Sequence, residues 1–63
     1  MNGNNRDDIK PGMEVEVILK EHQGTGTLTR GRVAEILTSS DFHHRGIKVR
    51  LEDGQVGRVQ NIL

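Results

Sequence analysis

The stretch RLEDGQVGRV, residues 50–59, decides the fold that we predict for this chain. Alternating apolar and polar residues flank an Asp-Gly pair within it. Asp53-Gly54 in such a setting is a strong short-range signal for a β-hairpin, because the tight turn needs positive φ angles that glycine adopts freely. The last third of the chain is therefore predicted to be a hairpin whose first strand contains IKVRLE, residues 47–52.

The register of this hairpin depends on the length of its turn. If the Asp-Gly pair formed the whole turn, the alternation would place Arg58 in the core and Val59 outside it. A bulge at Gly57-Arg58, or a three-residue turn with Gly54 in the left-handed region, would return Val59 to the buried side. We therefore assign Asp53, Gly54 and Gly57 to backbone geometry, in a turn or a bulge. Both alternatives leave Arg58 on the exterior.

Upstream of the hairpin, MEVEVILK, residues 13–20, alternates in the way that is typical of a strand with one buried face. Directly before it, Pro11 and Gly12 occupy the centre of a predicted type II turn. After the loop EHQGTGT, the segment LTRGRVAEIL resumes the strand pattern. Gly31 and the missing N-cap residue argue against a helix in RVAEIL, and we assign Gly31 to a bend or bulge.

The small size of the chain favours a closed sheet. It has 63 residues, of which 32% are hydrophobic, and no cysteine for a disulfide or thiolate site. A chain of this length buries only about 60% of its unfolded surface, and closing the sheet hides both of its edges. We predict an all-β, SH3-like barrel of four to five strands as a single domain over residues 8–63. Residues 1–7 are predicted to form a disordered tail, because they contain no apolar residue after Met1.

The charges are balanced overall but unevenly distributed. Residues 1–27 carry three Lys or Arg and five Asp or Glu, whereas residues 28–63 carry six and four. Cations spaced two apart on a strand share a face. The sequence therefore predicts a basic outer face that contacts RNA phosphates. Its members are Arg30, Arg32, Lys48, Arg50 and Arg58. The alternative is a solvated barrel exterior whose arginine stems cover aliphatic surface.

The scarcity of aromatic residues narrows the choice of ligand. Phe42 is the single Phe, Tyr or Trp of the chain. Single-strand binders that stack bases, methyl-lysine readers and polyproline grooves all depend on aromatic side chains. Structured RNA and protein surfaces therefore remain as partners. Phe42 itself is either a lid on one end of the barrel or an exposed anchor.

Metal binding and catalysis find little support in the sequence. His43 and His44 are adjacent, so they diverge on an extended backbone, and no zinc-ligand spacing includes His22. Ser39 and Asp41 lie close to His43, but a triad needs a rigid pocket that a chain of this size does not promise. We expect no enzymatic activity, no metal and no cofactor.

The sequence also resembles two known families. IKPGMEVEVILK followed by GTLTRGRVAEI resembles the KOW motif of ribosomal and transcription-elongation proteins, which implies an SH3-like barrel and RNA contacts. The matching positions are Gly12, Val15, Val17, Gly31, Val33 and Ile36. From Ile9 onward the chain more closely resembles the YwbE-like family of short, uncharacterised bacterial proteins, through IKPG, LTRG and GIKVRLEDGQVGRVQNI. That resemblance implies a small β domain and no particular activity.

These observations predict a non-catalytic binding module that contacts structured RNA or a ribonucleoprotein. The alternative is an adaptor that binds protein, with the C-terminal Ile62 and Leu63 either closing the barrel or meeting a partner. The longest apolar run is interrupted by charges, so we expect neither a membrane span nor a signal peptide. We expect a cytoplasmic monomer.

Overall fold

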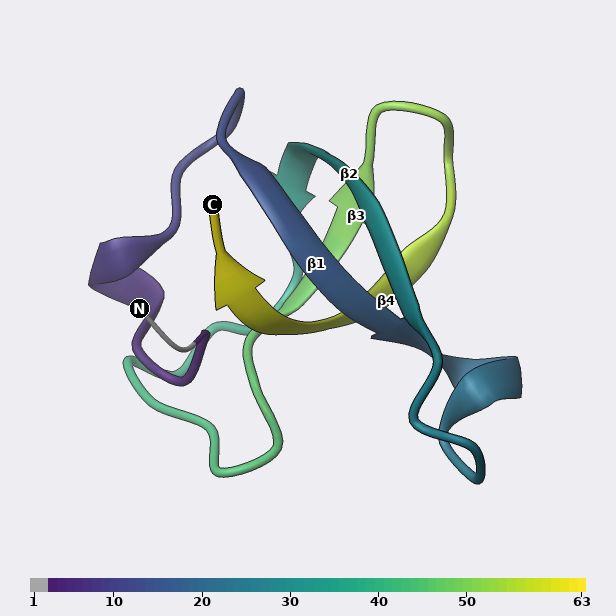
Figure 1. Cartoon of the computed structure of the whole chain (residues 1–63). Helices are drawn as coiled ribbons and strands as arrows, with labels where there is room; N and C mark the ends of the chain where they lie inside the picture. The colour runs from purple at the N-terminus through teal and green to yellow at the C-terminus, as the bar shows by residue number, and fades with distance from the viewer. Residues whose placement is uncertain (1–2) are drawn as a thin grey trace.

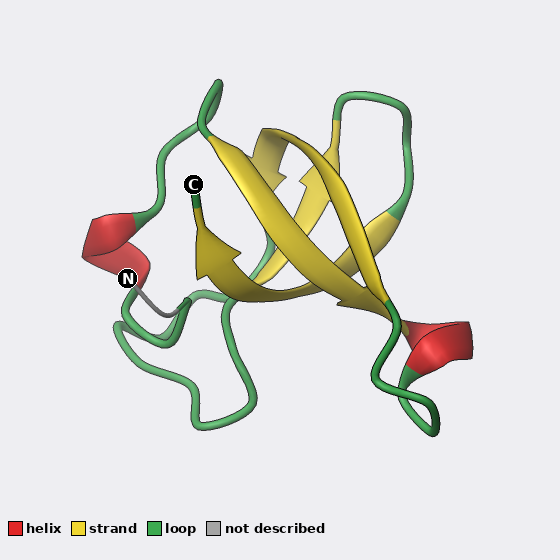
Figure 2. Cartoon of the chain, viewed as in Figure 1, coloured by secondary structure: helices red, strands yellow, loops and turns green. Residues whose placement is uncertain are grey.

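The computed structural model describes residues 3–63 and shows four antiparallel strands that close into a small SH3-like barrel (Figure 1). The strands are β1 (Glu14–Leu19), β2 (Leu28–Ile36), β3 (Lys48–Leu51) and β4 (Val56–Ile62). The chain also forms two single-turn 3-10 helices, η1 (Arg6–Asp8) and η2 (Lys20–His22). The strands neighbour one another in chain order, and β4 pairs with β1 to close the ring. Figure 2 shows both helical turns outside the barrel. The predicted all-β fold class is confirmed, with four strands.

The first two strands follow the predicted alternation. Val15, Val17 and Leu19 of β1 are buried, whereas the residues between them are half-buried on the outer side. The Pro-Gly turn before β1 is also as predicted, because Gly12 has a φ of 92° and the Met13 N–H donates to the Lys10 carbonyl at 3.2 Å. β2 continues through RVAEIL, so the segment is a strand and not a helix.

The β3–β4 hairpin uses the three-residue turn, which was the second of the two predicted alternatives. The Leu51 N–H donates to the Gln55 carbonyl at 2.7 Å, and Gly54 has a φ of 92°. The Asp53 carboxylate accepts hydrogen bonds from the Gln55 backbone N–H at 3.0 Å and from its side-chain amide at 2.6 Å. These bonds hold the pKa of Asp53 below its usual value. The turn sets the register that buries Val59.

The prediction of a turn or bulge at Gly57 is wrong. Gly57 lies in regular pairing, opposite Val49 of β3 and Leu19 of β1. A Cβ at Gly57 would lie 2.7 Å from the Ile18 carbonyl oxygen, so glycine allows β1 and β4 to approach closely. The bulge of β4 falls instead at Gln60, where its register with β1 shifts by one residue.

Gly31 also has a packing role and not the predicted bend or bulge. It lies within β2 opposite Val15, and a Cβ there would be 2.8 Å from Leu51 Cδ1. The missing side chain leaves room for Leu51 in the barrel interior. The irregularity of β2 occurs further along, at Ala34, where the register with β3 shifts.

The interior is aliphatic among the described residues. Nine hydrophobic side chains are at most 5% exposed, and no polar or charged side chain is buried with them. They are Ile9, Val15, Val17, Leu19, Val33, Ile47, Val49, Leu51 and Val59. Ile36 and Ile62 are partly buried and pack against this cluster. The core is therefore drawn from all four strands and from the segments that precede β1 and β3.

The N-terminal segment differs from the predicted tail over residues 1–7. Residues 1–2 of that prediction lie outside the described residues. Residues 3–7 lie along the loop that joins β2 to β3, and the Ile47 and His43 N–H groups donate to the Gly3 and Asn4 carbonyls at 2.7 and 2.9 Å. Asn5 forms an isolated antiparallel bridge with Phe42. Figure 1 shows this N-terminal segment, in purple, beside the loop.

The close approach at Gly57 predicts a large effect of adding one methyl group. We expect Gly57→Ala to lower the free energy of unfolding by about 1–3 kcal/mol, because the contacting atom belongs to the β1 backbone and cannot rotate away. Gly24→Ala is the matched control, since a Cβ there meets no atom within 4 Å. Its effect should stay within about 0.5 kcal/mol. Urea denaturation measures both, and equal effects would contradict the proposed reason for glycine at position 57.

Candidate nucleic-acid interface

A row of outward-facing residues crosses all four strands on one side of the barrel. In the strand registers Leu28 is opposite Ile18, Ile18 is opposite Arg58, and Arg58 is opposite Lys48. Residues opposite one another on neighbouring strands have Cβ atoms about 5 Å apart. The row therefore joins two apolar side chains to two cationic ones without an acidic residue between them.

Two open hollows of about 310 and 300 Å³ lie along this row and share three lining residues. We call their combined lining the Arg58 surface. It consists of Ile18, Lys20, Gln23, Arg45, Lys48, Val56, Gly57, Arg58 and Gln60. Within residues 3–63, this lining contains four cations, two amide side chains and no carboxylate. Its composition suits an anionic, hydrogen-bonding ligand.

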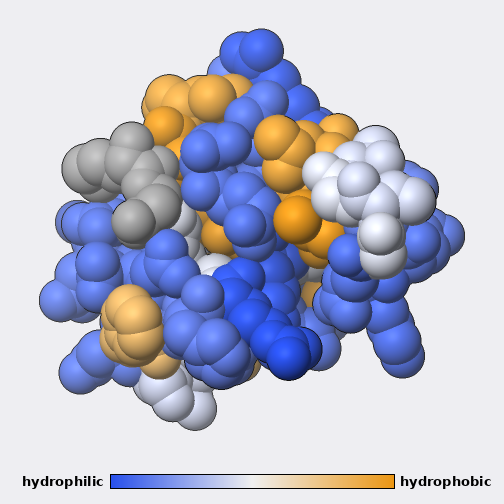
Figure 3. Space-filling model, turned by 60° about the horizontal axis from the view of Figure 1, so that its bottom comes forward, coloured by the Kyte–Doolittle hydropathy of each residue, from blue (hydrophilic) through white to orange (hydrophobic). Residues whose placement is uncertain are grey.

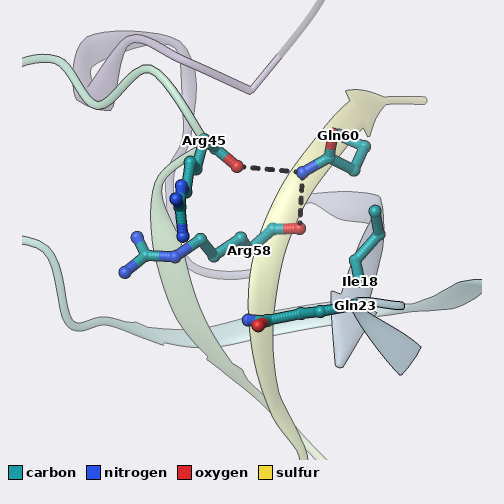
Figure 4. A pocket seen from close by; sticks show the side chains of 5 residues that line it. All are labelled: Ile18, Gln23, Arg45, Arg58 and Gln60. Atoms are coloured by element: carbon teal, nitrogen blue, oxygen red, sulfur yellow. Dashed lines mark hydrogen bonds between the residues drawn. The ribbon is translucent and has the colours of Figure 1, made fainter. Parts of the chain in front are cut away.

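Hydrogen bonds to backbone carbonyls hold the arginines of the Arg58 surface in place. The Arg58 guanidinium donates from Nη1 to the Gly46 carbonyl at 3.1 Å. The Gln60 side-chain amide donates to the carbonyls of Arg45 and Arg58 at 3.0 and 3.3 Å. Figure 4 shows these two bonds and the Arg45 and Arg58 side chains on the same side of β4. Because its acceptor is a carbonyl and not a carboxylate, the Arg58 guanidinium keeps its charge for a ligand.

Two of the predicted cations lie elsewhere, on β2. Arg32 is opposite Glu14 and Arg30 is opposite Glu16. Arg30 Nη2 also forms an ion pair with Glu14 Oε1 at 3.0 Å, and the two side chains are 63% and 42% exposed. The hydrogen bond from Arg30 lowers the pKa of Glu14 and raises that of Arg30. This pair is an exposed surface ion pair, which contributes little to stability.

Arg50 is paired as well. Its Nη1 forms an ion pair with Glu35 Oε1 of β2. The five predicted cations therefore do not form one basic face: Lys48 and Arg58 lie together on β3 and β4, whereas Arg30, Arg32 and Arg50 lie opposite or beside glutamates.

Sequence reasoning missed two members of the Arg58 surface, Lys20 and Arg45. Both lie outside the strands, Lys20 in η2 and Arg45 in the loop before β3. Strand periodicity therefore could not place Arg45, and it put Lys20 at the end of the first predicted strand, where the structure has η2. The one signal in the sequence that could have pointed to Arg45 is the excess of cations over acidic residues in residues 28–63.

The loop before β3 also places two histidines beside these arginines. The rings of His43 and His44 stack with centroids 5.0 Å apart and 12° between their planes. The Arg45 N–H donates to His43 Nδ1 at 3.1 Å, so this nitrogen is an acceptor and the neutral ring carries its proton on Nε2. Partial burial, together with the charges of Arg58, His44 and Arg45, lowers the pKa of His43.

The apolar surface residues fall on several elements. Phe42 is 57% exposed, so it is an exposed side chain and not a lid on the barrel. Leu63 is 55% exposed, whereas Ile62 packs against the core. On the face seen in Figure 3, hydrophilic residues cover most of the surface and hydrophobic ones form separate small patches.

Neither a cluster of metal-ligating side chains nor a membrane-spanning helix is found in the described part of the chain. Within residues 3–63, no three His, Cys, Asp or Glu side chains are grouped to hold a metal ion. The His22 Nδ1 atom is buried without a hydrogen-bond partner. No helix in residues 3–63 is long and apolar enough to cross a membrane.

The fold and the site define a small SH3-like β-barrel with one basic outer surface, the Arg58 surface, whose lining contains no carboxylate within residues 3–63. Comparison with protein families matches residues 2–62 to the family described as "Uncharacterized conserved protein (DUF2196)", and the chain belongs to this family. It is 57% identical over 63 residues to "Uncharacterized protein YwbE" of Bacillus subtilis (strain 168), an alignment that covers 100% of this chain and 97% of the relative. The resemblance to the YwbE-like family is thereby confirmed. Comparison with solved structures finds no match.

The surroundings of His43 predict how its protonation changes with pH. We expect NMR titration to give His43 a pKa below the ordinary value of about 6.5, and Arg58→Gln to shift it upward because one neighbouring cation is removed. With a lowered folded-state pKa, the unfolded chain binds more protons. The contribution of His43 to stability is therefore complete above about pH 6.5 and is lost as pH falls through the folded pKa. A measured pKa at or above the ordinary value would contradict this environment.

Proposed function

We propose that this protein binds structured RNA, free or within a ribonucleoprotein, through the Arg58 surface and without catalysis. One observation carries the proposal: four cations gather around Ile18 in hollows whose lining includes no carboxylate within residues 3–63. Elsewhere on the barrel, Arg30 and Arg50 are bonded to glutamates. A cation that already pairs with a carboxylate gains less binding free energy from a phosphate than an unpaired cation does.

The chemistry of the surface fits a nucleic-acid backbone. Lysine and arginine neutralise phosphates and release condensed counterions, and amide side chains such as Gln23 and Gln60 add hydrogen bonds to phosphates or sugars. Lys48 and Arg58 rise from paired strands, and Arg58 is also held by the Gly46 carbonyl, so little ordering of these two side chains opposes binding. Double-stranded RNA is recognised mainly by its shape, its phosphates and its 2′-hydroxyls, which asks for a surface of this kind and not for a deep pocket.

The resemblance to the KOW motif supports the kind of barrel on which this proposal rests. Four of its matching positions, Val15, Val17, Gly31 and Val33, line the interior of β1 and β2 and therefore serve the fold. The resemblance thus supports the kind of barrel, and the proposed contacts come from β3, β4 and the loops. We further propose that the protein is a monomer in the bacterial cytoplasm, where structured RNA is abundant.

A protein-binding adaptor is the second candidate. The outward row that contains Arg58 also includes Ile18 and Leu28, and Leu28 is 44% exposed. Apolar side chains beside cations are typical of protein interfaces with acidic partners. Binding to such a partner would require Leu28, whereas phosphate contacts would not.

The RNA proposal is tested by removing two cations of the Arg58 surface. We expect Arg45→Gln with Lys48→Gln to weaken binding to an RNA duplex by roughly tenfold at low salt and to reduce the slope of log affinity against log salt by about two. Both side chains are exposed, so the barrel should remain folded. Fluorescence anisotropy with a labelled duplex, repeated over a range of salt concentrations, measures both quantities.

The matched control removes two cations from β2 instead. Arg30→Gln with Arg32→Gln changes the net charge by the same amount, but these arginines face glutamates. We expect the control to bind almost as well as the parent chain. Equal losses of RNA affinity in the two double variants would reject the Arg58 surface as the binding site. Tighter binding of the parent chain to a DNA duplex of the same sequence than to the RNA duplex would reject RNA as the preferred ligand. Failure of the parent chain to bind the RNA duplex even at low salt would leave the adaptor as the favoured function.

A further inference from the structure

We infer that Phe42 is a stacking platform for an unpaired base, so that the RNA recognised by this protein is a duplex next to a single-stranded nucleotide. The inference rests on the proposed function and specifies its ligand. It begins with exposure: the only aromatic side chain among Phe, Tyr and Trp in the chain is 57% exposed to solvent. A side chain of this size more often lies in the core or at an interface.

The loop that carries Phe42 also carries Arg45 of the Arg58 surface. Phe42 is three residues before Arg45, so their Cα atoms are at most about 11 Å apart. The loop turns between them, because the Gly46 N–H donates to the His43 carbonyl at 3.0 Å. The charge of Arg58 also acts on His43, the residue that follows Phe42. A strand whose phosphates contact Arg45 and Arg58 therefore passes within reach of the ring.

The backbone that carries Phe42 is held from both sides by the N-terminal segment. The Arg6 N–H donates to the Asp41 carbonyl at 2.8 Å, and the His43 N–H donates to the Asn4 carbonyl at 2.9 Å. The Asn4 side-chain amide donates to the carbonyls of His43 and His44, each at 3.0 Å. An aromatic ring on a fixed backbone loses little freedom when a ligand packs against it. The platform is thus present before RNA arrives.

Stacking explains the combination of one exposed aromatic with several cations better than duplex binding alone. Bases inside a duplex are stacked on each other and cannot reach a side chain, whereas unpaired bases in loops, bulges and ends stack on aromatic rings. A single platform accommodates one such base. The cations hold the adjoining duplex by its phosphates. The two elements together select a junction between paired and unpaired RNA.

The test compares a blunt RNA duplex with the same duplex carrying a short single-stranded 3′ or 5′ overhang. We expect the parent chain to bind one of the overhang duplexes at least about fivefold more tightly than the blunt one, the lower end of what one stacked base contributes. Phe42→Ala should abolish this preference and leave affinity for the blunt duplex and the salt dependence unchanged. Because Phe42 is exposed, the variant should unfold at the same urea concentration as the parent.

A second variant gives a direct readout of stacking. The chain contains no Trp or Tyr, so Phe42→Trp introduces a unique fluorophore at the platform. Its emission should be quenched by the preferred overhang duplex and not by the blunt duplex, and the preference should be retained. Leu63→Trp, at another exposed apolar position, is the control and should show no quenching.

The outcomes separate this inference from the proposed function. Equal binding of blunt and overhang duplexes, with Phe42→Ala unchanged on both, overturns the stacking platform while RNA binding through the cations stands. Absence of quenching in Phe42→Trp under saturating overhang duplex also overturns it. If neither the blunt nor the overhang duplex binds at low salt, the proposed function is overturned, and the stacking platform with it.

Discussion

Closure of the barrel depends on the close approach of β1 and β4 beside Gly57. A side chain at this position would collide with the Ile18 carbonyl, so the two strands can pair because glycine is there. Their pairing joins the last strand to the first and encloses the aliphatic core. In a chain this short, little other buried surface is available to hold the two strands together. The same pairing sets Arg58 beside Ile18 on the outside.

Strand pairing also sorts the surface charges. The outward residues of β1 are Glu14, Glu16 and Ile18, in that order. Arginines of β2 fall opposite the two glutamates, whereas Arg58 of β4 falls opposite Ile18. One strand with glutamate at one end and isoleucine at the other thus neutralises one set of cations and leaves another available. This difference in partners, and not the number of cations, separates the Arg58 surface from the remaining exterior.

The segments outside the strands complete this surface. η2 brings Lys20 and the turn after it brings Gln23, and the loop before β3 brings Arg45. The loop is long and buries few of its side chains, so its conformation depends on hydrogen bonds to residues 3–6 and on the bond from Arg58 to the Gly46 carbonyl. The N-terminal segment therefore holds the loop that carries Arg45, although it contributes little to the core.

The sequence by itself determined the fold class, the buried faces of the strands, the Pro-Gly turn and the hairpin, because each follows from local alternation and from glycine at positive φ. It narrowed the hairpin register to two alternatives, and packing against the core decided for the turn at Gly54. Only the tertiary structure decided that Gly31 and Gly57 make room for neighbours, that residues 3–7 dock on a loop, and which cations share a surface. These features arise between segments distant in the chain, and periodicity along one strand carries no information about what lies across from it.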